Sequence, residues 1–142
     1  MGYRRQSREL ALQFLYQIDI TRDDPQTSLD LFRQHFKVSS KTREFFDQLL
    51  DGIFLHKEKI DLLIEEFSEH WRFTRIAKVD RNILRIAIFE LLFCPDIPSK
   101  VTLNEAIDLG KKFGSQDSGS FINGILDKIN FNIKENKGAI LH

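Results

Sequence analysis

The sequence has few of the residues that covalent or metal chemistry needs. Cys94 is the single cysteine among 142 residues, which excludes an internal disulfide bond and a cysteine-rich metal site and is typical of a reducing cytosol. The four histidines lie in separate segments and never at a metal-ligand spacing, and no glycine-rich phosphate loop occurs. The sequence therefore indicates no catalytic residue, no metal ligand and no cofactor, and predicts a protein that is not an enzyme.

Net charge and long hydrophobic runs are also missing. No signal peptide and no apolar run of membrane-spanning length occurs, which predicts a cytoplasmic protein without a membrane partner. The 21 Lys and Arg side chains balance the 21 Asp and Glu side chains, and a neutral protein does not bind nucleic acid by bulk electrostatics alone. Residues 21–70 carry 7 basic and 11 acidic side chains, so the remainder has a net charge of +4. This distribution fits a modest RNA affinity that a partner must reinforce.

Hydrophobic side chains recur at helical spacing in every long segment, and none of these segments shows sustained alternation. The pattern predicts an all-α fold of about seven helices, with residues 1–142 as a single compact domain. Thirteen phenylalanines are ample for a core. We expect two packed helical halves around a central helix over 80–93, because that segment is apolar nearly all round. Within it, Glu90 is expected to be a buried partner of an arginine such as Arg85, and Cys94 is expected to be packed.

Helix starts are predicted from capping residues. Thr27 or Ser28 is a plausible N-cap for a short second helix. Thr102 and Glu105 have the spacing of a capping box, in which the threonine caps the helix and the glutamate bonds back to it.

Three arginines, Arg4, Arg5 and Arg8, lie at the start of an amphipathic helix. The positive end of the helix dipole disfavours guanidinium groups there, and their spacing brings the charges close together. A cluster that helix formation does not favour points to an external anion, with RNA phosphate as the leading candidate. The alternative is a solvated, frayed terminus with ordinary surface arginines. In either case, replacing the three arginines is expected to leave folding stability nearly unchanged.

Phe121 is a candidate aromatic contact. On a helical wheel it lies off the apolar face of its helix and beside Lys128. An aromatic ring at a basic rim can stack on an unpaired RNA base, whereas the alternative is packing at the rim of the core.

Three ordered stretches resemble the NusB family of transcription antitermination factors along essentially the whole chain: RRQSRELALQFLY, WRFTRIAKVDRNILRIAIFEL and VTLNEAIDLGKKFGSQDSGSFINGILDKI. The resemblance implies an all-helical RNA-binding protein that joins the ribosomal protein NusE on single-stranded boxA RNA, so that the antitermination complex modifies RNA polymerase. The sequence does not decide whether the protein forms a homodimer.

The resemblance also implies site residues. The RNA-binding positions are Arg4, Arg5, Arg8, Tyr16, Asp117 and Phe121, to which the helical wheel adds Lys128. The NusE-binding positions are Arg75 and Asp80, within the loop that starts at Trp71.

Two other functions are open from the sequence. The same helical pattern resembles the N-terminal RNA-binding module of Sun-type ribosomal RNA cytosine methyltransferases, a function that needs a methyl-donor loop these residues do not contain. The other is a non-catalytic interaction module whose arginines are incidental.

Overall fold

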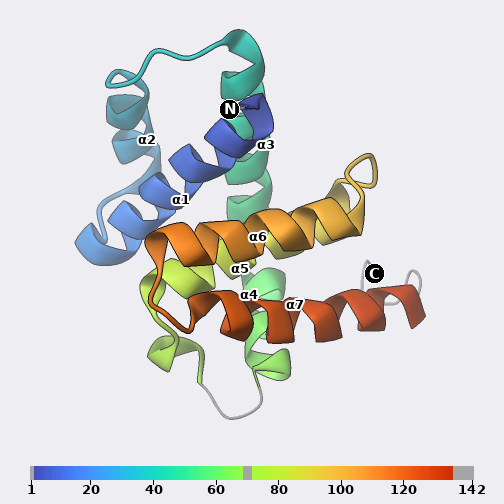
Figure 1. The fold of residues 1–142 in the computed structure, drawn as a ribbon. Coiled ribbons are helices and arrows are strands. Elements are labelled where there is room, and N and C mark those ends of the chain that lie inside the picture. The colour runs from blue at the N-terminus through green and yellow to red at the C-terminus, as the bar shows by residue number, and fades with distance from the viewer. Residues whose placement is uncertain (1, 69–71, 136–142) are drawn as a thin grey trace.

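The structure is a computed structural model that describes residues 2–68 and 72–135. Over these residues it is all-α, as expected, with seven α-helices and one 3-10 turn (Figure 1). The elements are α1 (Tyr3–Thr21), α2 (Pro25–Arg33), α3 (Ser40–Leu55), α4 (Lys57–Phe67), η1 (Phe73–Arg75), α5 (Lys78–Phe93), α6 (Ser99–Phe113) and α7 (Ser118–Glu135).

Helix α5 is the centre of the fold, as its all-round hydrophobicity predicts. It packs against five of the other helices, α1, α3, α4, α6 and α7. Figure 1 shows α6 and α7 side by side, with α5 largely behind α6 and with α1, α2 and α3 forming the upper half of the view. Eleven residues of α5 are buried, including the polar residues Asp80, Asn82, Arg85 and Glu90.

The contact between α3 and α5 requires a glycine. A Cβ at Gly52 would lie 1.9 Å from the Phe89 ring, far closer than packed carbon atoms approach. The missing side chain therefore lets Phe89, on the central helix, pack directly on the α3 backbone.

Two predicted helix starts are wrong. Helix α2 begins at Pro25, because Asp24 is the N-cap and its side chain accepts from the Thr27 amide at 3.0 Å. Helix α6 begins at Ser99, which places Thr102 inside the helix and leaves no capping box with Glu105. Both side chains of the supposed box instead bond to other helices, Thr102 to Glu90 on α5 and Glu105 to arginines on α1.

None of the helices in the described parts of the chain combines the length and the hydrophobicity needed to cross a membrane.

Candidate nucleic-acid interface

Arg8 is an internal residue of the fold. Its side chain is 3% exposed, and its Nε and Nη2 atoms each donate to a Glu90 carboxylate oxygen at 2.7 Å. Its Nη1 donates to Glu105 at 3.1 Å, and the Thr102 hydroxyl donates to Glu90 at 3.1 Å. These bonds join the start of α1 to α5 and α6, which explains why an arginine lies at an unfavourable end of a helix.

Glu90 is buried and paired with an arginine, as expected, but its partner was wrongly predicted. Arg85 lies on the same helix and bonds instead to Asp61 on α4 and Asp19 on α1. Glu90 points toward α1, where Arg8 satisfies both of its oxygens. A buried ion pair is costly to break from one side, so for Arg8 the structure replaces the expectation of nearly unchanged stability with that of a clear loss.

Arg4 and Arg5 remain reachable from solvent, with side chains 38% and 46% exposed. Arg4 donates to Asp96 at 3.0 Å. Arg5 bonds to Glu105 through Nε and Nη2, and its Nη2 also donates to Asp108 at 3.0 Å. The hydrogen bonding of the Arg5 guanidinium to the Glu105 carboxylate, which accepts from it, is the main cause that raises the pKa of Arg5.

These two arginines belong to a formed helix and not to a frayed terminus. Helix α1 already begins at Tyr3, and its first turn contains no acidic side chain. Arg4 and Arg5 thus place two guanidinium groups at the positive end of the α1 dipole. Their pairing with carboxylates of other segments offsets that unfavourable position.

An open groove of about 710 Å³ lies between α1, the start of α5 and the end of α6. Its lining includes Leu10 and Val79, and two exposed aromatic rings, Tyr16 at 41% and Phe113 at 44%. Lys112 Nζ lies 3.1 Å from both Glu9 oxygens and 5.1 Å from the centroid of the Phe113 ring. Tyr16 is therefore accessible for contact with a ligand.

The sequence interpretation missed Phe113. The signal was present, because an aromatic side chain follows two lysines at the end of an amphipathic helix. Periodicity alone does not distinguish this role, because it places Phe113 with the apolar face of α6 although the ring is 44% exposed in the last turn.

The candidate residues on α7 lie outside this groove. Phe121 is half-buried and packs against the edge of the core. Its buried part fits packing at the rim of the core, and its exposed part leaves the ring accessible to an RNA base. Asp117, just before α7, and Lys128 on its outer side are exposed. The structure thus brings Tyr16 together with Phe113 but does not place Phe121 in the same groove.

The candidate NusE-binding residues differ from each other in exposure. Arg75 is exposed at the end of η1, whereas Asp80 is 7% exposed in the first turn of α5. Asp80 hydrogen-bonds to Ser118, but its Oδ1 is buried and has no partner among residues 2–68 and 72–135. Burial raises the pKa of Asp80. Trp71, the expected start of this loop, lies outside the described residues.

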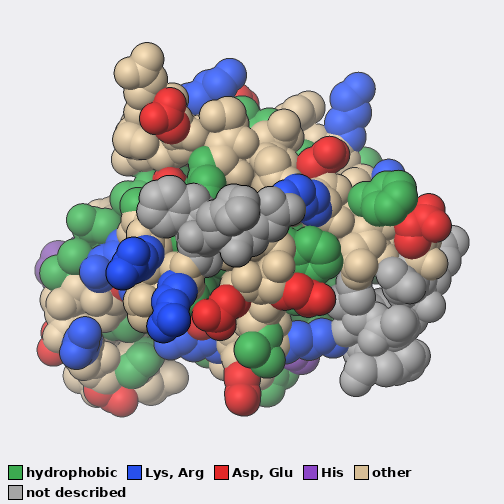
Figure 2. All heavy atoms as spheres, turned by 90° about the horizontal axis from the view of Figure 1, so that it is seen from below, with side chains coloured by type: hydrophobic (Ala, Val, Ile, Leu, Met, Phe, Trp, Pro, Cys, Tyr) green, Lys and Arg blue, Asp and Glu red, His purple; other side chains and the backbone are tan. Residues whose placement is uncertain are grey.

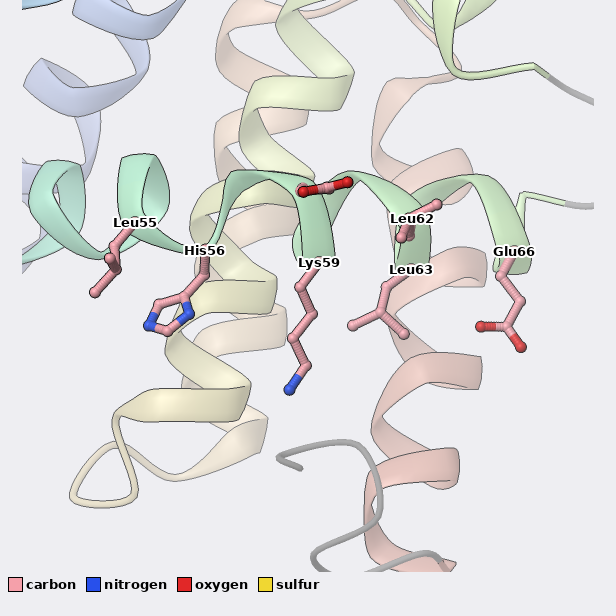
Figure 3. A pocket seen from close by; sticks show the side chains of 7 residues that line it. Leu55, His56, Lys59, Leu62, Leu63 and Glu66 are labelled. Atoms are coloured by element: carbon pink, nitrogen blue, oxygen red, sulfur yellow. The ribbon is translucent and has the colours of Figure 1, made fainter.

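A second open hollow, of about 560 Å³, follows the junction of α3 and α4. Figure 3 shows its lining, which includes Leu55, His56, Lys59 and Glu66 but none of the expected site residues. Among the described residues, no group of three or more His, Cys, Asp or Glu side chains could hold a metal ion.

Charge is mixed on the surface as well as in the composition. On the described part of the face in Figure 2, Lys and Arg side chains lie among Asp and Glu side chains. Taken together, the described residues form an all-helical protein that exposes arginine and aromatic side chains along α1 and at the end of α6.

The chain belongs to the NusB family, whose family model matches residues 5–131. A transcription antitermination protein NusB from Desulfatibacillum aliphaticivorans is 49% identical over 138 residues, which cover 96% of each chain. Among solved structures, T. maritima NusB has a TM-score of 0.83 and 37% identity, with 90% of each chain covered. A complex of the antitermination factors NusB and NusE with double-stranded RNA matches with a TM-score of 0.80 and 29% identity, covering 93% of this chain and 98% of that one. The family is a class of transcription factors and not of enzymes.

Proposed function

We propose that this protein is a cytoplasmic transcription antitermination factor that binds single-stranded boxA RNA together with NusE, and that the assembly acts on RNA polymerase. Residues 1–142 act as a single domain in this proposal. Family membership supports it, as does the similar structure in which NusB and NusE bind RNA. The relatives are antitermination proteins covered over nearly their whole length, which does not favour the methyltransferase alternative.

The observation that carries the proposal is the arrangement on α1. Arg4 and Arg5 expose guanidinium groups in its first turn, and the exposed ring of Tyr16 lies on the same helix beside Phe113. Guanidinium groups bind phosphate, and aromatic rings stack on unpaired bases, so both components of single-strand recognition are present. Asp117, Phe121 and Lys128 extend the proposed RNA surface onto α7. Arg8 belongs to this site as a positioning residue, because it is buried against Glu90.

The proposed NusE surface includes Arg75 and Asp80. The Oδ1 atom of Asp80 is buried without a hydrogen-bond partner among residues 2–68 and 72–135, so a donor from a bound protein could satisfy it only after a local rearrangement exposes it. Asp80→Asn keeps the size of the side chain and removes its charge. We expect it to weaken NusE binding and to leave RNA binding by the chain alone nearly unchanged.

The test is fluorescence anisotropy of labelled boxA RNA against the chain alone and against the chain with NusE. A double variant, Arg4→Ala with Arg5→Ala, should bind RNA more weakly and with a smaller salt dependence, by up to about two phosphate contacts. Lys37→Ala with Lys57→Ala removes the same charge from other segments and serves as the control. An interaction module with incidental arginines would bind NusE but show no difference between the two double variants. Sedimentation of the same samples tests the homodimer.

A further inference from the structure

The arginines proposed to bind RNA phosphates already have carboxylate partners in the free chain. Arg4 pairs with Asp96, Arg5 with Glu105 and Asp108, and Arg8 with Glu90 and Glu105. The carboxylates differ widely in exposure: Glu90 is 1% exposed, Glu105 17%, Asp108 55% and Asp96 67%. The cluster is therefore neutralised before any RNA arrives.

An RNA phosphate that binds Arg4 or Arg5 through Nη2 competes with a carboxylate that already accepts from that atom. Nη2 of Arg5 donates to both Glu105 and Asp108. Whichever of these two carboxylates is held less strongly can leave and free an N–H donor of the guanidinium for a phosphate. Ion pairs between exposed side chains are worth little, whereas a buried pair is strongly held. Asp108 is exposed and makes one bond to Arg5, whereas Glu105 is also held by Arg8.

We propose that Asp108 and Asp96 set the RNA affinity of this surface by occupying Arg5 and Arg4 until RNA phosphates replace them. Arg8 keeps Glu90 and Glu105 throughout and fixes the end of α1 on which the exchange takes place. The inference rests on the proposed function, because it concerns the same RNA surface. The exchange predicts a weaker RNA affinity than free arginines would give, since a phosphate contact at Nη2 of Arg4 or Arg5 breaks an ion pair.

A simpler role for Asp108 would be general repulsion of RNA by a nearby negative charge. The two roles differ in their dependence on Arg5. Competition for Arg5 disappears when Arg5 is removed, whereas long-range repulsion remains. A double-mutant cycle between Asp108 and Arg5 therefore separates them.

The experiment measures the affinity of labelled boxA RNA by anisotropy at one fixed salt concentration. Asp108→Asn is expected to bind about two- to fivefold more tightly than the unmodified chain, the range expected for release from an exposed ion pair. Asp30→Asn removes the same charge from an exposed position on α2 and is the matched control. In the Arg5→Ala background, Asp108→Asn should give no gain beyond that of Asp30→Asn. Asp96→Asn should behave in the same way toward Arg4.

A gain that persists in the Arg5→Ala background would overturn the exchange in favour of simple repulsion. A gain no larger than that of Asp30→Asn would overturn it as well. In both cases RNA binding that still depends on Arg4 and Arg5 would leave the proposed function standing. If the double variant Arg4→Ala with Arg5→Ala bound RNA as tightly as the unmodified chain, both the RNA role of these arginines and the exchange would be refuted.

Discussion

Arg8 and Arg5 lie three residues apart on α1 and share Glu105 as a partner, yet Arg8 is 3% exposed and Arg5 is 46% exposed. Arg8 points between α1, α5 and α6, where Glu90 satisfies two of its donors. Arg5 lies at the edge of the same contact, where its second partner, Asp108, is largely in solvent. The same residue type within one turn thus stabilises the fold at one position and remains available to an anion at the other. Four predictions test this contrast, starting with the largest expected effect.

Replacing the buried arginine should have the largest effect. Arg8→Ala leaves the Glu90 carboxylate buried without its main partner, which should lower the free energy of unfolding by about 3–5 kcal/mol. Denaturant unfolding followed by circular dichroism measures the change. The paired variant Arg8→Met with Glu90→Leu should recover much of the loss, because it removes both charges. A small loss for Arg8→Ala would contradict the internal role of this residue.

Replacing Phe121 should cost less stability than replacing the buried Arg8 and more than replacing the exposed Arg5. Its ring is half-buried at the edge of the core, so Phe121→Ala should cost about 1–3 kcal/mol of stability, less than a fully buried phenylalanine. If the exposed part of the ring also stacks on a base, RNA affinity should fall by about 1–3 kcal/mol. Unfolding and RNA titration of this variant measure both effects. Normal RNA affinity of the folded variant would assign the ring to the core alone.

Asp80 contrasts with Glu90, because both are buried carboxylates of α5 but, within residues 2–68 and 72–135, only Glu90 has an arginine partner. Burial raises the pKa of Asp80 in the folded chain above its value in the unfolded chain. The contribution of the protonated Asp80 carboxyl to the free energy of unfolding is therefore complete below the pKa that Asp80 has in the unfolded chain. It is lost as the pH rises through the pKa that Asp80 has in the folded chain. Asp80→Asn should raise the melting temperature at pH 7, with a gain that shrinks toward about pH 4. Asp30→Asn is the exposed control, and an equal pH dependence of both variants would contradict the assignment.

The smallest effect on stability is expected at Arg5. Arg5→Ala removes only solvent-exposed ion pairs and an unfavourable charge at the start of α1, so the unfolding midpoint should not change measurably. RNA affinity of the same variant should fall. A midpoint shift comparable with that of Arg8→Ala would remove the distinction between the two arginines.

Most of the fold could be predicted from the sequence, whereas the partners in the site could not. The helical spacing of hydrophobic residues correctly indicated seven helices and a central α5, because periodicity within one segment reports its own buried face. The start of α2 was misplaced because Asp24 and Pro25 cap it earlier than Thr27 would. The spacing of Glu105 from Thr102 wrongly predicts a capping role, because that spacing is local whereas the arginines that bind Glu105 are on another helix.

The amino-acid sequence by itself determined that the chain is helical, which of its helices is central and that an arginine cluster opens the first helix. Those properties depend on residues a few positions apart, so they are visible along the chain. Only the tertiary structure decided which arginine is internal, because Arg8 and Glu90 are 82 residues apart and meet through the packing of α1 on α5. The same packing leaves Arg5 at the surface, where Asp108 and a phosphate can compete for it.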